Sequence, residues 1–256
     1  MKLLLWKPYG ITSNYFTQQL QHKNTYVKIC YAGRLDPLAQ GVMLILTDHD
    51  VKNMSENLLH NKTYTFDIIL GIDTSSCDIA GTVIHDTNFD DSDINIDYIN
   101  NKLIEFIASY SHQSYPPISS FVVKHDIYGR KPLWWYAKNN IDVPIPNKNV
   151  TIHNYKIYTT SKINSIEFYN NAIQRLQTIT NTKTIEELEI ISFIDYYTNT
   201  LHSLVESKNT KDMYKIKISM ELTVSTGFYI RQFCNDFGKF INIPGIAFDI
   251  TRTHVC

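Results

Sequence analysis

An aspartate between two glycines is the residue in this sequence best suited to act as a nucleophile or general base. Asp36 lies between Gly33 and Gly41 and is followed directly by Pro37. Because proline restricts the preceding residue to extended backbone, we expect the carboxylate to project from a rigid loop. Asp-Pro is also a frequent turn pair, so the residues alone leave open a structural aspartate that caps a turn.

Three further segments carry side chains that suit recognition or proton transfer. Tyr64 lies in an alternating segment, where a half-buried tyrosine is the structural alternative. Basic and aromatic residues are mixed over residues 129–138, a composition that suits phosphate contact and base stacking but also occurs in cores. Arg231 follows a glycine turn at the start of a predicted helix, where an exposed first-turn arginine is the alternative. The polar run 73–78 between these segments is predicted to be a turn or surface loop.

Taken in chain order, these segments resemble the TruB family of tRNA pseudouridine synthases. The resemblance covers residues 1–160 and 213–254. It rests on Lys7-Pro8-Tyr9-Gly10-Ile11-Thr12-Ser13, on Gly33 with Leu35-Asp36-Pro37 and Ala39-Gln40-Gly41, on Lys62-Thr63-Tyr64, on Leu70-Gly71 with Asp73-Thr74 and Asp78, on Pro116-Pro117, and on Gly227-Phe228-Tyr229-Ile230-Arg231.

The resemblance implies a role for each matching residue. Asp36 is expected to be the catalytic carboxylate that opens the glycosidic bond of a target uridine, either by attack on the ribose or by removal of a proton beside it. Tyr64 is expected to stack on the flipped base and to take part in proton transfer from its carbon. Arg231 would pair with Asp36, and Tyr229 and Ile250 would line the base pocket. The resemblance implies neither a cofactor nor a metal ion.

Two further positions and two larger features complete the comparison with the family pattern. Lys7 is expected to be a basic support near the substrate. Tyr31 stands where many members have a histidine that helps to hold the flipped-out RNA. Residues 161–211 are longer than the usual connection and are expected to be an insertion. Because the chain ends at Cys256, we expect a single catalytic domain over residues 1–256 without the C-terminal PUA-type RNA-binding domain of many relatives.

The implied function is isomerisation of a uridine to pseudouridine, with the T-loop uridine of tRNA as the expected target. A synthase acting on another RNA such as mRNA, and a non-catalytic RNA-binding or folding protein on the same scaffold, remain alternatives. A glycosidase with paired carboxylates is a weaker one, since no second acid is surrounded by a motif. The expected partner is the T-arm of tRNA, bound by a monomer.

The charge balance leaves RNA binding open. The chain has 24 Lys and Arg against 25 Asp and Glu, a formal net charge of −1, whereas RNA-binding proteins are usually basic. Seven of the acids lie in residues 73–100, which contain no Lys or Arg. The rest of the chain therefore has 24 basic residues against 18 acidic ones, and we expect that surplus to serve RNA docking.

The remaining composition excludes several classes of protein. The four cysteines form no CxxC pair and the nine histidines show no HxH or HxxxH spacing, so a structural zinc site is unsupported. Free thiols are typical of a reducing compartment, and no signal peptide or membrane span is recognisable. We expect a cytoplasmic protein, with a nuclear location as the alternative.

Hydrophobic spacing predicts the elements that hold these residues in place. Strands are expected at residues 2–6, 42–46, 63–70, 121–123, 150–158 and 214–224, and helices from residue 12 or 13 to 22 and at 99–109, 133–138 and 228–241. The strands are too irregularly separated for a βαβ repeat. Together with the resemblance, this pattern predicts an α/β fold of the α+β kind, with a central mixed, largely antiparallel sheet, flanking helices and an RNA-binding cleft.

Overall fold

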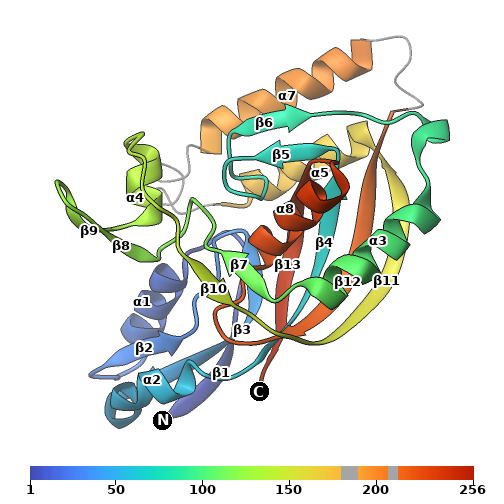
Figure 1. Cartoon of the computed structure of the whole chain (residues 1–256). Helices are drawn as coiled ribbons and strands as arrows, with labels where there is room; N and C mark the ends of the chain where they lie inside the picture. Colours follow the sequence, from blue (N-terminus) through green and yellow to red (C-terminus); the bar gives the residue numbers. More distant parts are fainter. Residues whose placement is uncertain (180–189, 207–212) are drawn as a thin grey trace.

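The computed structural model describes residues 1–179, 190–206 and 213–256, and it confirms the expected α/β fold (Figure 1). Within these residues the largest sheet has seven strands, which pair in antiparallel fashion except for the parallel neighbours β3 and β13. Their spatial order is β1 (Lys2–Lys7), β3 (Ala39–Thr47), β13 (Gly245–Val255), β4 (Lys62–Leu70), β12 (Tyr214–Val224) and β11 (Ile152–Asn164), with β2 (Ile29–Ala32) paired to β3.

Alternating and continuous apolar runs explain the central strands. In β12, Ile216, Ile218, Met220, Leu222 and Val224 are each no more than 1% exposed, because every second side chain of a strand points to the same face. Its neighbour β4 is buried along almost its whole length, as expected for a strand covered on both faces.

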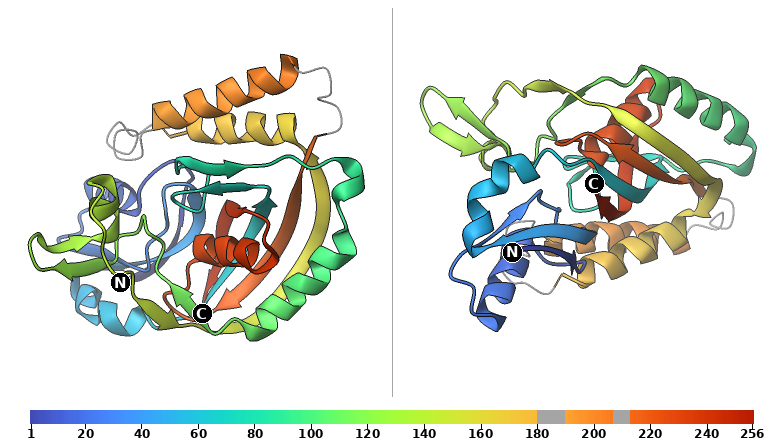
Figure 2. Two further views of the ribbon diagram at one scale, coloured as in Figure 1. Left: turned by 45° about the horizontal axis from the view of Figure 1, so that its top comes forward. Right: turned by 90° about the horizontal axis from the view of Figure 1, so that it is seen from below.

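Helices cover both faces of the sheet (Figures 1 and 2). On one face, α3 (Ile96–Ser109) and α8 (Ile230–Ile241) pack Phe106 against Phe233, with ring centroids 5.3 Å apart. On the other face, α5 (Ser165–Gln177) and α7 (Ile190–Glu206) cover a second core cluster. The described part of residues 161–211 therefore consists of the end of β11, helix α5, which packs on the sheet, and helix α7, which packs on α5, while 180–189 and 207–212 lie outside the described residues.

Several smaller elements lie outside the seven-stranded sheet (Figure 1). Helix α1 (Ser13–Lys23) begins as predicted, with the Thr12 side chain accepting a hydrogen bond from the Tyr15 amide at 3.0 Å. The other small elements are α2 (Met54–Asn57), the β5 (Ile72–Thr74) and β6 (Val83–Asp86) pair, the β7 (His112–Ser114) and β10 (Asn147–Asn149) pair, and the β8 (Val122–His125) and β9 (Gly129–Pro132) hairpin that leads into α4 (Leu133–Lys138).

Candidate active site

The loop that carries Asp36, between β2 and β3, is fixed by hydrogen bonds to its backbone. The Ser13 hydroxyl donates to the carbonyl of Leu35 at 2.7 Å and accepts from its amide at 2.9 Å. The amide of Gly10 donates to the carbonyl of Pro37 at 3.0 Å. The segment before α1 therefore holds the residues on either side of Asp36, and the carboxylate is presented from a rigid loop as the sequence predicts.

Two fully buried cations hold the same loop from behind. The Lys7 ammonium donates to the carbonyl of Ala39 at 2.6 Å, and the Arg252 guanidinium donates to those of Gly33 at 3.0 Å and Val42 at 2.6 Å. Burial lowers the pKa of Lys7 to about 7, against the opposing effect of the Asp36 charge. Lys7 is thus a basic support close to Asp36, but it is fully buried and holds the loop from inside the protein.

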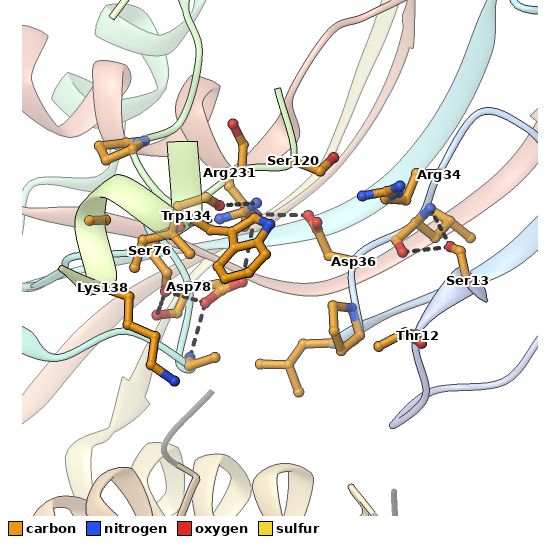
Figure 3. Close-up of a pocket in the computed structure, with 18 of the residues that line it drawn as sticks. Thr12, Ser13, Arg34, Asp36, Ser76, Asp78, Ser120, Trp134, Lys138 and Arg231 are labelled. Carbon is orange, nitrogen blue, oxygen red and sulfur yellow. Dashed lines mark hydrogen bonds and ion pairs between the residues drawn. The ribbon is translucent and has the colours of Figure 1, made fainter. Parts of the chain in front are cut away.

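Asp36 pairs with Arg231, as expected. The Arg231 Nε lies 2.8 Å from Asp36 Oδ2 and 3.7 Å from Asp78 Oδ2 (Figure 3). Burial disfavours the charged guanidinium, but the carboxylates of Asp36 and Asp78 outweigh it and raise the pKa of Arg231. The Arg231 side chain is 5% exposed and that of Asp36 is 35% exposed, so the cation is buried behind an accessible anion.

The Arg231 guanidinium donates two further hydrogen bonds. Its Nη1 donates to the carbonyl of Ser76 at 2.6 Å and its Nη2 to that of Ile118 at 3.1 Å. Since these partners come from two separate loops, the planar guanidinium is held in one orientation. The alternative of an exposed first-turn arginine is excluded.

Asp78 is a member of this site that the sequence interpretation placed in a turn or surface loop. It is 7% exposed, and it accepts hydrogen bonds from the Ser76 hydroxyl at 2.5 Å and the Ala80 amide at 3.0 Å. Burial raises the pKa of Asp78, with the nearby Arg231 charge acting in the opposite direction. The surface-loop prediction is therefore wrong for Ser76 and Asp78, because the buried Arg231 lies opposite them.

A pocket of about 860 Å³ opens in front of Asp36 (Figure 3). It lies between the start of α1, the Asp36 loop, the β5–β6 connection and α4. The α4 side of this pocket carries Trp134 and Lys138, and Trp134 is 39% exposed. Of the two sequence-based interpretations of the aromatic segment, the structure favours a ligand platform for Trp134.

Tyr31 also lines the pocket, next to a cation that the sequence analysis did not single out as a site residue. The Tyr31 hydroxyl accepts a hydrogen bond from Arg34 Nη2 at 3.1 Å, and the Arg34 guanidinium lies 5.8 Å from the Tyr31 ring centroid. Arg34 itself lines the pocket beside Asp36. Its position two residues before the aspartate was the available sequence signal.

Tyr64 and Ile250 lie on adjacent central strands, behind the pocket rather than in its wall. Tyr64 is 9% exposed and belongs to the main core cluster. Ile250 is 6% exposed, pairs with Ala39 across β13 and β3, and lines a small cavity that also borders Asp36. The structure thus places Ile250 beside the carboxylate and Tyr64 in the main core cluster, outside the walls of both cavities.

Tyr229 lies at the start of α8, and the Gln113 side chain binds both its backbone amide and its carbonyl. The Tyr229 amide donates to Gln113 Oε1 at 2.8 Å, and its carbonyl accepts from Gln113 Nε2 at 2.9 Å. The Lys148 ammonium lies 4.1 Å from its ring centroid and 4.4 Å from that of Tyr115. Burial, with a smaller contribution from the Asp36 charge, raises the pKa of Tyr229 to about 12, so its hydroxyl is protonated at neutral pH.

No group of three or more His, Cys, Asp or Glu side chains is arranged to hold a metal ion in residues 1–179, 190–206 and 213–256. In the same part of the chain, every helix is too short or too polar to cross a bilayer.

Comparison with known proteins relates this site to one family. Residues 19–174 match the model of the N-terminal domain of TruB family pseudouridylate synthases. The protein named tRNA pseudouridine synthase B of Malacoplasma penetrans is 29% identical over 97% of this chain and 82% of its own length. The proteins of that name from Blochmanniella floridana and Mycoplasma capricolum are 33% and 37% identical over 64% and 60% of this chain, and the matches span only 60% and 50% of those proteins.

Solved structures show the same fold. A structure of an H/ACA RNP bound to a substrate RNA containing 2′-deoxyuridine and one of a Cbf5–Nop10–Gar1 complex each superpose with a TM-score of 0.52 at 12% identity. Each match covers 99% of this chain and under half of the other chain. The fold, the Asp36–Arg231 ion pair and the matched domain agree, and the chain belongs to the TruB family of pseudouridylate synthases.

Proposed function

We propose that this protein isomerises the T-loop uridine of tRNA to pseudouridine, without cofactor or metal ion. The observation that carries the proposal is the Asp36 carboxylate, held by Arg231 at 2.8 Å and open to a large pocket. The curated relatives bear the name tRNA pseudouridine synthase B, which supports tRNA as the substrate.

The reaction rearranges one nucleotide without loss or gain of atoms. The bond between C1′ of the ribose and N1 of uracil breaks, the base rotates, and a bond forms between C1′ and C5. The proton on C5 then leaves and N1 gains a proton. Asp36 acts at the first step, either by attack on C1′, which forms an ester bond that breaks when C5 bonds to C1′, or by removal of the C2′ proton, which returns to C2′ after that bond has formed. Both routes need an ionised carboxylate, which the buried positive charge of Arg231 stabilises when the base excludes water from the site.

The pocket offers contacts that suit a flipped nucleotide and its phosphates. Trp134 can stack on a base, while Arg34 and Lys138 are cations at the pocket wall. Extrusion of a base from folded RNA costs a few kcal/mol, and such contacts offset that cost.

The hairpin beside the pocket adds further positive charge. Lys124 and Arg130 are exposed and stand directly opposite each other across β8 and β9. Like charges in this position repel each other, and a phosphate between them would relieve the repulsion. This arrangement supports RNA as the class of ligand.

We further infer that the enzyme acts as a monomer in a reducing compartment such as the cytoplasm. All the groups described around Asp36 come from one chain. The four cysteines are free thiols, which suits the reducing interior of a cell.

The test uses purified protein and three transcribed RNAs: a whole tRNA, the isolated T-arm hairpin and an unrelated mRNA fragment. Pseudouridine is mapped by chemical labelling and primer extension. Conversion of the T-loop uridine in the tRNA and the hairpin alone would support the proposal. Conversion confined to the mRNA would overturn the substrate assignment. RNA binding without conversion of any uridine would favour the non-catalytic alternative.

A further inference from the structure

The end of helix α5, which lies in the segment predicted to be an insertion, contacts residues that hold the active-site loop. Leu38, two residues after the catalytic aspartate, belongs to the same core cluster as Phe168 and Leu176 of α5. The carbonyl of Thr178, just after α5, approaches Gly10 so closely that a Cβ on Gly10 would lie 2.7 Å from that oxygen. Gly10 in turn donates its amide hydrogen bond to the loop.

Arg175, in the last turn of α5, makes three contacts at this junction. Its Nη1 lies 2.7 Å from Asp249 Oδ1. Its guanidinium carbon lies 5.1 Å from the ring centroid of Tyr9 and 5.2 Å from that of Phe248, distances typical of cation–π contacts. Tyr9, Phe248 and Asp249 all line the small cavity that also borders Asp36.

Asp249 is the residue at which β13 bends. Its φ of +51° lies in the left-handed region, which is unfavourable for a residue with a side chain. The pairing of β13 with β4 shifts register between Phe248 and Thr251, which marks a bulge at this point. The next residue, Ile250, pairs with Ala39 at the end of the loop. The ion pair with Arg175 therefore holds the strained residue that fixes where Ile250 meets the loop.

We propose that Arg175 is a positioning residue for the isomerisation. It fixes Tyr9, Phe248 and Asp249, which line the small cavity next to Asp36. The proposal rests on the function proposed above. A direct RNA contact is disfavoured because Arg175 is paired with Asp249, packed on two rings and 29% exposed. The described part of the predicted insertion would then contribute to catalysis and would not be a surface segment without function.

The first test compares Arg175→Met, Arg175→Lys and a control. Methionine keeps the apolar stem and removes the charge, while lysine keeps a charge that can reach Asp249. The control, Lys162→Met, breaks the Lys162–Asp91 ion pair of 2.5 Å, in which Lys162 is 27% exposed. Arg175→Met should lower the single-turnover rate at saturating tRNA about tenfold, with the Kd for tRNA unchanged within about twofold. Arg175→Lys should recover part of the rate, and the control should match the wild type.

A second variant tests the route of the effect. Asparagine tolerates positive φ, so Asp249→Asn keeps the bend and removes the ion pair. It should lower the rate to a similar extent, and the double variant with Arg175→Met should be no slower than either alone, because both remove the same interaction. Fully additive losses would overturn the proposed route.

Hydrogen exchange gives a readout that does not require activity. Amides of residues 36–40 and 248–252 should exchange faster in Arg175→Met than in wild type, and not in Lys162→Met. Unchanged exchange there, a wild-type rate in Arg175→Met, or a loss confined to RNA affinity would each overturn the inference. If the wild type converts no uridine, the proposed function fails and the positioning role of Arg175 with it. If the wild type is active, the variants test Arg175 alone.

Discussion

Asp36 and Arg231 meet at 2.8 Å although 195 positions separate them in the chain. The two side chains are not equivalent, because the carboxylate faces the pocket and the guanidinium is buried with a second carboxylate, Asp78, 3.7 Å away. Loss of the anion leaves Arg231 with a remaining acidic neighbour. Loss of the cation leaves two carboxylates facing each other. The two substitutions should therefore differ in their effects on activity and on stability.

Replacement of Asp36 by Asn should abolish isomerisation while leaving the fold and RNA binding intact. Asparagine keeps the shape of the side chain but can neither attack the ribose nor take a proton. The single-turnover rate should fall by at least about 10³-fold. Pseudouridine formation and the Kd for tRNA are measured on the same preparations. Product formation by Asp36→Asn at more than a few per cent of the wild-type rate would rule out the catalytic role.

Replacement of Arg231 by Gln should destabilise the protein by roughly 3–5 kcal/mol, the usual cost of removing one partner of a buried ion pair. Asp78 sits in an environment that already raises its pKa, and without Arg231 its protonated form gains further. The stability deficit should therefore grow as pH rises above the ordinary Asp range and shrink toward pH 5. Urea unfolding at pH 5 and pH 8 measures both values.

The matched double variant tests the cause of that deficit. Adding Asp78→Asn to Arg231→Gln removes the uncompensated buried charge and keeps an oxygen that can accept from Ser76 and Ala80. It should recover part of the stability at pH 8. No recovery would show that the cost arises from the lost hydrogen bonds to Ser76 and Ile118 instead.

Lys7 should make the protein more stable as pH rises from about 7 to 10. Its folded-state pKa of about 7 lies below the ordinary lysine value of 10.5, so the unfolded chain binds more protons across this range. Lys7→Met should reduce the slope of unfolding free energy against pH by about 1 kcal/mol per pH unit. Lys28→Met, at an exposed lysine, is the control and should leave the slope unchanged. Equal slopes for all three proteins would contradict the buried position of the Lys7 ammonium.

Trp134 should contribute to RNA affinity by stacking. Truncation to alanine should weaken tRNA binding by about 1–3 kcal/mol, or roughly 5- to 150-fold, without loss of stability, since the side chain is 39% exposed. Trp6→Ala is the matched control, because Trp6 is 52% exposed on β1 and does not line the pocket. Equal affinities for the two variants, measured at one salt concentration, would exclude the stacking role.

The affinity for RNA should fall as the salt concentration rises, but less steeply than the surplus of six basic residues counted from the sequence would predict. Three acids of residues 73–100 form ion pairs with Arg231, Lys215 and Lys162. Setting those three cations aside leaves 21 basic residues against the 18 acids outside the segment, half the surplus counted from sequence. We expect the logarithm of the association constant to fall with the logarithm of salt at a slope of about −2 to −4, which corresponds to three to five phosphate contacts. A flat response would show that charge does not drive docking.

Strong local patterns were enough to predict part of the fold. The alternation in residues 214–224 gave β12 at its observed bounds, and residues 133–138 gave α4. Strand β13 was not predicted, because its apolar alternation is interrupted at Asp249, where the backbone bends. Strand β2 and the β5–β6 pair are too short to stand out from the surrounding polar residues.

Two residues of the candidate site, Asp36 and Arg231, could be predicted from the sequence because they belong to motifs of the family. The residues that the sequence interpretation missed or placed wrongly owe their burial to partners far away in the chain. Asp78 is buried because Arg231 packs against it, and Lys7 is buried because Ala39 offers its carbonyl across the sheet. No local pattern contains such information, since the partners are more than 30 positions away.

The parallel pairing of β3 with β13 has a consequence for how the enzyme is made. Arg252 binds the carbonyls of Gly33 and Val42, and Ile250 pairs with Ala39, so the loop that carries Asp36 is complete only after residues 250–252 have been synthesised and have docked. Contacts between segments this far apart in the chain form late in folding. A nascent chain on the ribosome would thus lack a working site until residues 250–252 have emerged, and could not modify RNA before then.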